Sequence, residues 1–461
     1  MKSILQNKAY LYLTCLFLGI ITSFSLPPYN FVFLNFLSLP TLLYILINYA
    51  HKKIISFFVG WVFGFGYFIS NLYWITNSLT FDVNFKLIIP FALILIPLFL
   101  GIFYGLVTFL SSLFNLKNKL SSVLIFSIFF GGIEFLRSFI LGGFPWNLLV
   151  FSVSNNLPSL QILSYVGTYS LNLLSITIFL LPIIFFHKYK SSAAVIFFCF
   201  GLILVVINYS YGYFNIKNFE KKKYDKLDSV IRVVSPKVPI ERFLTNQSPE
   251  KNIDELLTLS DPNKSEKKIF IFPEGIITSI YFRDLKFFKN IFKKKFNTNH
   301  KVILGINSIK ENKIYNSLVV LNSDTELLYK YNKNKLVPFG EFLPFENFFK
   351  RVGLKKITQG YQSFSADNKR EILNIDKIKF IPLICYEIIY SGKINPNKKY
   401  YDFILNISED GWFGKSIGPA QHLSHSIFRS IEEGKNVIRS TNNGVSAFVN
   451  PKGQIIKQIS E

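Results

Sequence analysis

The feature that most constrains this chain is a series of apolar stretches that fills its first 211 residues. Each stretch is close to the ~20 residues that an α-helix needs to cross a hydrocarbon core of about 30 Å. We therefore expect a multi-span α-helical membrane domain over residues 1–211, with about seven transmembrane helices. The stretches are residues 9–26, 31–50, 54–76, 87–114, 120–141, 159–186 and 192–211.

The lysines between these stretches predict their orientation. Lysines cluster before the first stretch and in every second connection after it: Lys2, Lys8, Lys52, Lys53, Lys117, Lys119, Lys188 and Lys190. The other connections are nearly free of basic residues, with Lys86 as the exception. Because short cytoplasmic loops carry the excess of Lys and Arg, we expect a cytoplasmic N-terminus. Seven spans then place everything after residue 211 on the outer side of the membrane.

The composition is consistent with a membrane protein and argues against several other classes of protein. Half of the chain is hydrophobic, which is high for an ordinary soluble protein. The formal net charge of +23 has two interpretations: attraction to an anionic surface, or a general bias towards Lys, Asn, Ile, Phe and Tyr. No sequence signature indicates nucleic-acid binding. The three cysteines, Cys15, Cys199 and Cys385, are far apart in the sequence, which excludes a disulfide scaffold and a Cys-rich metal site.

Two ionisable residues lie at membrane depth in the fifth stretch. Glu134 and Arg137 are three residues apart in "GGIEFLRSF", a spacing at which two side chains meet on one face of a helix. A self-satisfied pair near one end of the span is the simpler interpretation. An ion path through a transporter is the alternative.

The second half of the chain is predicted to be a soluble α/β domain. A charged linker is expected over residues 212–228, followed by the domain at 229–461. Short β-rich runs alternate with two helical patterns, at 284–296 and 420–439, which is typical of a layered α/β fold. The strand-length runs are residues 229–236, 267–275, 300–307, 315–322, 326–332, 378–387 and 401–414.

Three of the predicted strands end on polar residues of complementary kinds. Glu274 ends "IFIFPEG", Lys335 and Glu341 follow "ELLYKYN", and Cys385 ends "FIPLIC". A thiol becomes a nucleophile only as the thiolate, so it needs a base and benefits from a nearby cation. Glu274 is the candidate base and Lys335 the candidate cation. Taken singly, each residue has a plain structural interpretation, a small buried hydrophobe or a solvated charge, and only the combination favours catalysis.

The motifs around these residues identify a resemblance. "FPEG", "KLVPFGEFLP", "CYE", "DGWFG" and "RSTNNGVSA" resemble the carbon–nitrogen hydrolase (nitrilase) superfamily. The membrane motifs "GWVFGFGYFISNLYWI" and "GIEFLRSFILGGFPWN" narrow the resemblance to the bacterial apolipoprotein N-acyltransferase family. The resemblance implies a nitrilase-like α-β-β-α sandwich at 229–461. It implies a multi-pass protein of the bacterial inner membrane, with a periplasmic catalytic domain.

The same resemblance implies an activity. Members of the family transfer a fatty acyl chain from a glycerophospholipid, through a thioester, to the N-terminal amine of a diacylglyceryl-cysteine in an apolipoprotein. Cys385 would be the nucleophile, Glu274 the general base and Lys335 the group that stabilises the tetrahedral intermediates. No metal, no organic cofactor and no nucleic acid is implied, and we expect a monomer.

The resemblance also implies roles for residues near the catalytic triad of Glu274, Lys335 and Cys385. Three residues would support it: Glu341, Tyr386 and Glu387. Two aromatic residues, Phe243 and Trp412, would contact the substrate.

The chain departs from the family pattern at several positions. Glu409-Asp410 stands where the family usually has Asn-Asp, and Phe243 follows Arg242 where Trp commonly follows Lys. The family's "Q-x-N" pattern on the first strand is replaced by "SPKVP". The family generally continues into a final membrane span, whereas this sequence stops at Glu461. We therefore expect either a C-terminal truncation or a missing anchor.

Two other functions compete with acyl transfer to an amine. The first is a membrane-tethered amidase or phospholipid acyl hydrolase that uses water as the acceptor. The second is a non-enzymatic transporter or degenerate scaffold, against which the combination of Glu274, Lys335 and Cys385 argues.

Overall fold

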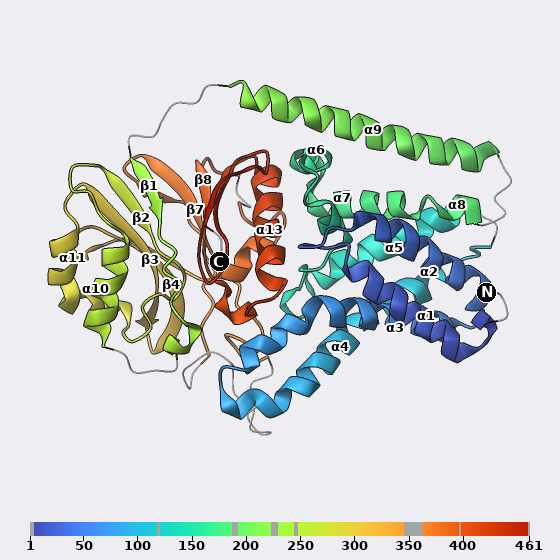
Figure 1. Cartoon of the computed structure of the whole chain (residues 1–461), viewed down its shortest axis with the longest axis horizontal. Helices are drawn as coiled ribbons and strands as arrows, with labels where there is room; N and C mark the ends of the chain where they lie inside the picture. Colours follow the sequence, from blue (N-terminus) through green and yellow to red (C-terminus); the bar gives the residue numbers. More distant parts are fainter. Residues whose placement is uncertain are drawn as a thin grey trace. The chain divides into compact units, whose positions relative to one another are not determined.

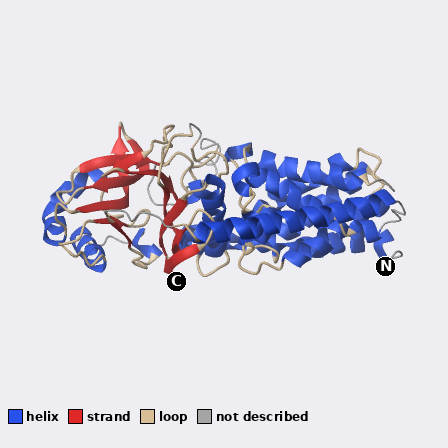
Figure 2. Ribbon diagram, turned by 90° about the horizontal axis from the view of Figure 1, so that it is seen from above, coloured by secondary structure: helices blue, strands red, loops and turns tan. Residues whose placement is uncertain are grey.

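The structure is a computed structural model, and it describes residues 4–117, 120–186, 192–222, 229–243, 248–344, 363–395 and 398–459. The chain divides into two compact units. The helical unit comprises Met1–Lys221 with Lys415–Ser424, and the sandwich unit comprises Lys222–Gly414 with His425–Glu461. Among the described residues, all β-strands belong to the sandwich unit, as Figure 2 shows in red.

A helix overlaps each of the seven apolar stretches of the helical unit (Figure 1). The seven helices are α1 (Lys8–Ser23), α2 (Asn35–Tyr49), α3 (Lys53–Leu72), α4 (Ile89–Ser111), α5 (Ser121–Arg137), α7 (Leu163–Leu180) and α9 (Ser192–Glu220). Two short helices, α6 (Leu157–Leu160) and α8 (Ile183–Phe186), lie beside α7 in the sequence. In the described part of the chain, five helical segments are long and apolar enough to cross a membrane, and Lys8–Ser23 is a shorter apolar helix. Helix α9 continues to Glu220, so the beginning of the expected linker at residue 212 is helical.

Glycines allow α1, α3 and α4 to pack closely. Gly60 and Gly64 lie one turn apart on α3, in the spacing that brings helices together in membranes. A Cβ atom on Gly60 would lie 2.2 Å from the carbonyl oxygen of Tyr104 in α4. A Cβ on Gly19 of α1 would lie 2.0 Å from the carbonyl oxygen of Phe63. Part of the motif "GWVFGFGYF" therefore encodes backbone-to-backbone contact between helices.

The predicted pairing of Glu134 with Arg137 is confirmed, and the pair belongs to a larger buried network. Arg137 Nη2 lies 3.6 Å from Glu134 Oε1, and both side chains are almost fully buried. Tyr104 donates to Glu134 Oε1 at 2.8 Å, and Asn172 donates to Oε2 at 2.5 Å. Arg137 also donates to the carbonyl of Phe144 at 2.5 Å. The network thus ties α4, α5 and α7 to the loop that follows α5.

The sandwich unit contains two sheets. The first has the order β1-β2-β3-β4-β5 and the second β11-β10-β9-β8-β7-β6. The first sheet consists of β1 (Val230–Val233), β2 (Lys268–Ile271), β3 (His300–Lys310), β4 (Lys313–Leu321) and β5 (Leu327–Asn332). The second consists of β6 (Leu373–Ile375), β7 (Ile378–Ile384), β8 (Phe403–Glu409), β9 (Asn436–Asn442), β10 (Ser446–Val449) and β11 (Ile455–Ile459).

Each sheet contains three neighbouring parallel strands, and their carboxyl ends lie at the same edge of the sheet. β1, β2 and β3 are parallel, as are β7, β8 and β9. Hydrogen bonds join the two sheets: the Ser235 hydroxyl, just after β1, donates to the carbonyl of Thr441 in β9 at 2.9 Å. The ends of the strands that carry the predicted site residues are thereby brought together.

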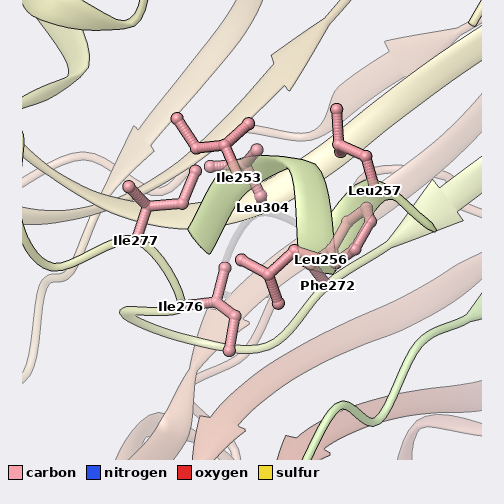
Figure 3. Close-up of a pocket in the computed structure, with 7 residues that line it drawn as sticks. All are labelled: Ile253, Leu256, Leu257, Phe272, Ile276, Ile277 and Leu304. Carbon is pink, nitrogen blue, oxygen red and sulfur yellow. The ribbon is translucent and has the colours of Figure 1, made fainter. Parts of the chain in front are cut away.

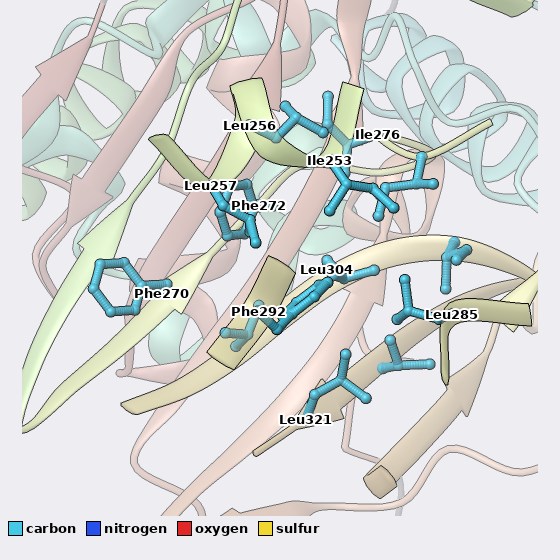
Figure 4. Packing of buried hydrophobic residues seen from close by; sticks show 14 of the residues in the cluster. Ile253, Leu256, Leu257, Phe270, Phe272, Ile276, Leu285, Phe292, Leu304 and Leu321 are labelled. Carbon is cyan, nitrogen blue, oxygen red and sulfur yellow. The ribbon is translucent and has the colours of Figure 1, made fainter. Parts of the chain in front are cut away.

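Helices cover the outer faces of the sheets, as predicted for an α-β-β-α sandwich (Figure 1). α10 (Pro249–Leu259) and α11 (Lys289–Lys295) cover the first sheet, and α13 (Gly418–Glu433) lies beside the second. Leu256, Phe272, Phe292 and Leu304 belong to the core beneath α10 and α11 (Figure 4). Burial of each such side chain stabilises the fold by about 1.5–3 kcal/mol.

The predicted strands are all present, but one helix boundary was wrong. The pattern at 420–439 was expected to be helical throughout. The structure ends α13 at Glu433 and begins β9 at Asn436. Gly434 separates them with a φ of +62°, a conformation that favours glycine and ends helices.

Candidate active site

Glu274 lies in the loop directly after β2. Its Oε1 accepts hydrogen bonds from Nδ2 of Asn316 at 2.7 Å and from Nζ of Lys333 at 3.2 Å. Its Oε2 accepts the backbone N–H of Glu409 at 3.0 Å. Gly305 of β3 lies against this loop so closely that a Cβ atom there would be 2.5 Å from Cα of Glu274. The carboxylate is therefore held by groups from β4, from β8 and from Lys333, the residue after β5.

Lys333, and not the predicted Lys335, is the cation beside Glu274. The Lys333 side chain is 1% exposed, and its Nζ also lies 3.0 Å from Oε1 of Glu341. The Lys335 side chain is exposed, and its backbone N–H donates to Glu387 at 3.2 Å. The prediction of Lys335 was wrong because β5 ends at Asn332. Lys333 follows immediately and still points inward, whereas the chain has turned by Lys335.

Lys333 remains an ammonium group in this environment. Burial by itself would lower its pKa, but the carboxylates of Glu274 and Glu341, together with Cys385, hold the pKa well above its ordinary value. A lysine that keeps its proton cannot act as a base. It can stabilise negative charge that develops on a reacting oxygen.

Cys385 lies at the sharp turn between β7 and the short 3₁₀ segment Cys385–Ile389. Its φ is +51°, in the left-handed region that residues other than glycine rarely adopt. Its carbonyl oxygen accepts Nδ2 of Asn406 in β8 at 3.3 Å. Strained positions of this kind cost of order 1–3 kcal/mol and occur most often at functional sites. The turn presents the thiol at the carboxyl edge of the second sheet.

The thiol of Cys385 is neutral at rest. Burial raises its pKa well above the ordinary value, and the negative charges of Glu274 and Asp410 raise it further. Lys333 and a hydrogen bond from Ser408 act in the opposite direction. Cys385 therefore interacts electrostatically with both Glu274 and Lys333. Because the thiolate is disfavoured, a base must remove the thiol proton as the reaction proceeds.

Glu341, predicted as a supporting residue, shares the same two partners as Glu274. Its Oε1 accepts from Nδ2 of Asn316 at 2.9 Å and from Lys333 at 3.0 Å. Its Oε2 accepts the backbone N–H of Val337 at 2.9 Å. Glu341 thus helps to fix the position of Lys333, together with Glu274.

Glu387 connects the lysine loop to the cysteine turn. Its side chain is fully buried and accepts the backbone N–H of Ile384 at 2.8 Å and that of Asn334 at 2.9 Å. Tyr331 donates to the same carboxylate at 2.8 Å, and Arg370 does so at 2.9 Å.

The remaining predicted residue of this group, Tyr386, is also buried. Its ring packs against that of Tyr390, with the ring centroids 5.4 Å apart. Glu387 and Tyr386 therefore support the turn that carries Cys385.

The two predicted substrate-contacting aromatics lie together. The rings of Phe243 and Trp412 are 5.3 Å apart between centroids, and both side chains are partly exposed. Next to them, the buried side chains of Arg242 and Glu409 form an ion pair. The charge that Glu409 adds, relative to the family pattern, is thus matched by a cation from a distant segment.

Several buried polar residues around the site were not predicted from the sequence. They are Asn316, Lys333, Asn406, Ser408 and Arg439, and the partly buried Arg370 joins them. Most of them are single polar residues within or just after apolar strands, such as Asn316 in "YNSLVVL". A polar residue in a strand that is buried on both faces needs a partner, and that pattern was the available signal.

A small hollow in the sandwich unit does not belong to the site. Its lining is entirely apolar (Figure 3): Ile253, Leu256, Leu257, Phe272, Ile276, Ile277 and Leu304. It lies within the core beneath α10. Among the residues that the structure describes, no group of three or more His, Cys, Asp or Glu side chains could hold a metal ion.

Comparisons with known proteins identify the family of the chain. Residues 18–181 match the family model of the apolipoprotein N-acyltransferase N-terminal domain, and residues 244–461 match that of carbon–nitrogen hydrolases. An apolipoprotein N-acyltransferase of Rhizobium rhizogenes is 30% identical over 96% of this chain and 86% of its own length. One of Rickettsia prowazekii is 31% identical over 97% of this chain and 89% of its own length.

The chain belongs to the apolipoprotein N-acyltransferase family. Membership makes it a membrane-associated acyltransferase, with a helical region followed by a domain of the carbon–nitrogen hydrolase fold.

Proposed function

We propose that this protein transfers a fatty acyl chain from a glycerophospholipid to the N-terminal amine of a diacylglyceryl-cysteine, through a thioester on Cys385. The observation that carries the proposal is the buried arrangement of Glu274 and Lys333, 3.2 Å apart, acting electrostatically on the neutral thiol of Cys385. This arrangement belongs to a chain of the family whose curated members are named for that acyl transfer.

The first half-reaction forms the acyl-enzyme. Glu274 removes the proton from Cys385 as the sulfur attacks the carbonyl carbon of the phospholipid ester. The resulting oxyanion is stabilised by the Lys333 ammonium and by backbone N–H groups near Tyr386. The intermediate collapses by breaking its bond to the glycerol oxygen, and Glu274 returns the proton to that oxygen. The lyso-phospholipid leaves, and the acyl chain remains as a thioester.

The second half-reaction consumes the thioester. The neutral α-amine of the diacylglyceryl-cysteine attacks the thioester carbonyl, and the same groups stabilise the second oxyanion. Glu274 accepts a proton from the attacking nitrogen and delivers it to the departing sulfur. An amide is formed and the thiol of Cys385 is regenerated. A covalent intermediate allows two bulky lipid substrates to use one site in turn.

The predicted membrane topology indicates on which side of the membrane the reaction takes place. With a cytoplasmic N-terminus and seven spans, the sandwich unit faces the outside of the inner membrane. There it reaches lipids of the outer leaflet and the lipid-modified N-terminus of a lipoprotein. Apolar helices from α1 to α9 anchor the chain beside both substrates, and the protein acts as a monomer. Phe243 and Trp412, which lie together beside Glu409, contact the lipid chains.

The competing function is hydrolysis, with water as the acceptor. It is tested with the purified full-length protein, a phospholipid carrying a labelled acyl chain and a synthetic diacylated lipopeptide. Label recovered as an amide on the lipopeptide supports the proposal. Label recovered only as free fatty acid, with acyl-enzyme still formed, identifies a hydrolase instead.

A further inference from the structure

We propose that Arg242 and Glu409 form a positioning pair that holds the catalytic carboxylate and the neighbouring aromatic residues in place for acyl transfer. The inference rests on the proposed function, because it assigns these residues a part in the same reaction. Both lie in the sandwich unit, 167 positions apart in the sequence, and neither was among the predicted catalytic residues.

Both carboxylate oxygens of Glu409 accept hydrogen bonds. The side chain is 1% exposed, and its Oε2 accepts from Arg242 and, at 2.8 Å, from Nδ2 of Asn442. Its Oε1 accepts the backbone N–H of Gly411 at 2.9 Å, which fixes the turn that carries Trp412. Burial raises the pKa of Glu409, while Arg242 opposes that shift. Arg242 is thus the main group that favours the ionised carboxylate, ahead of the hydrogen bonds from Asn442 and Gly411.

Arg242 fixes the opposing turn. Its Nη1 donates to the carbonyls of Val238 and Pro239 at 3.2 and 3.1 Å. Its guanidinium carbon lies 4.5 Å from the centre of the Phe243 ring. Because Arg242 and Glu409 bind each other, the turn with Phe243 and the turn with Trp412 are joined beneath their aromatic rings.

The pair is connected to the catalytic carboxylate in two ways. The backbone N–H of Glu409 donates to Oε2 of Glu274 at 3.0 Å, on the side away from Lys333. Arg242 Nη2 lies 3.4 Å from the carbonyl of Gly275, the residue after Glu274. Any displacement of the Arg242–Glu409 pair therefore changes the orientation of Glu274 directly.

The pair also balances charge next to the proposed base. Among the described residues, the charged and titratable groups around Glu274 and Cys385 include Lys333, Glu341, the Asp410–Arg439 ion pair and the Arg242–Glu409 pair. A buried carboxylate without its cation would disfavour further negative charge at the site, and an uncompensated guanidinium would favour it. Removal of either partner should therefore shift the pH dependence of acylation, in opposite directions.

The experiment measures acyl-enzyme formation from labelled phospholipid as a function of pH, without acceptor, in the full-length protein. We expect Arg242→Met to move the ascending limb of the profile up by about one pH unit and Glu409→Gln to move it down by a similar amount. The double variant should return the limb to within a few tenths of the wild-type position. Arg242→Lys, which keeps the charge, should shift it least among the Arg242 variants.

The controls separate this inference from the proposed function and from loss of folding. Arg283→Met removes an exposed arginine from the same unit and should leave the profile unchanged. A thermal unfolding curve is recorded for each variant. If Arg242→Met does not fold, the inference is tested by Glu409→Gln alone, through the expected downward shift of the ascending limb of its pH profile. If the wild type forms the acyl-enzyme and the pH profiles of the single variants are not shifted, the proposed role of the Arg242–Glu409 pair is wrong and the proposed function stands. Absence of any acyl-enzyme in the wild type overturns the proposed function itself.

Discussion

Lys333 places its ammonium nitrogen 3.2 Å from Oε1 of Glu274, with both groups buried. The relationship assigns them different roles, because a lysine held protonated by carboxylates is an electrostatic stabiliser and leaves proton transfer to Glu274.

Replacement of the two lysines after β5 separates their roles. We expect Lys333→Met to reduce the rate of acyl-enzyme formation by about 10²–10³-fold, the usual cost of removing one oxyanion-stabilising group. Lys335→Met should change the rate by less than about threefold, because an exposed charge contributes little. The measurement is single-turnover acylation with labelled phospholipid. Equal losses in the two variants would contradict the assignment of Lys333.

The reactivity of Cys385 towards an alkylating reagent should reflect its raised pKa. Because burial and Glu274 favour the neutral thiol, the alkylation rate should still be rising above pH 10, where an ordinary thiol with a pKa of about 8.5 has levelled off. Lys333→Met should slow alkylation further, since the lysine favours the thiolate. The rate is followed by peptide mass spectrometry in a Cys15→Ser, Cys199→Ser background. A plateau below pH 8 would show that the resting thiol is already ionised.

Glu387 should be essential for the stability of the sandwich unit. Glu387→Ala leaves Arg370, whose side chain is 13% exposed, without its carboxylate and removes the acceptor of the backbone N–H groups of Ile384 and Asn334. Breaking a buried ion pair costs about 3–5 kcal/mol, so we expect the thermal midpoint in detergent to fall by at least about 5 °C. Glu371→Ala, an unburied glutamate in the same unit, is the matched control. Unchanged midpoints in both would refute the structural role of Glu387.

Glu134 should stabilise the helical unit in the same way. Glu134→Ala removes the acceptor of Tyr104 and Asn172 and leaves Arg137 unpaired among apolar helices. We expect less folded protein in membranes and a thermal midpoint lowered by several degrees. The exposed Glu220→Ala, at the end of α9, provides the comparison. An ion path would instead predict normal stability with a changed ion flux.

Much of the architecture could be predicted because the sequence repeats its hydrophobic signals over long stretches. Every predicted apolar stretch overlaps a helix, and Glu274 and Cys385 follow strands that were recognisable from their apolar runs. Features set by single backbone turns were harder to predict. Lys333 and Lys335 are two residues apart and would lie on the same face of an extended strand. The alternation of side chains between the two faces therefore could not choose between them.

Interactions between distant segments could not be predicted from local patterns. The extra charge of Glu409 was visible in the sequence, but its partner, Arg242, lies in another turn and is brought close only by the packing of the two sheets. The end of α13 was also missed, because β9 follows it after two residues and continues the apolar pattern.

The central claim is that Cys385 carries the acyl chain with Glu274 as its base. Its most direct test is intact-protein and peptide mass spectrometry after incubation with phospholipid and no acceptor. We predict one acyl adduct, mapped to Cys385, that disappears when the lipopeptide amine is added and is absent in Cys385→Ser and Glu274→Gln. An adduct on another residue, or acyl transfer by Cys385→Ser, would contradict the account.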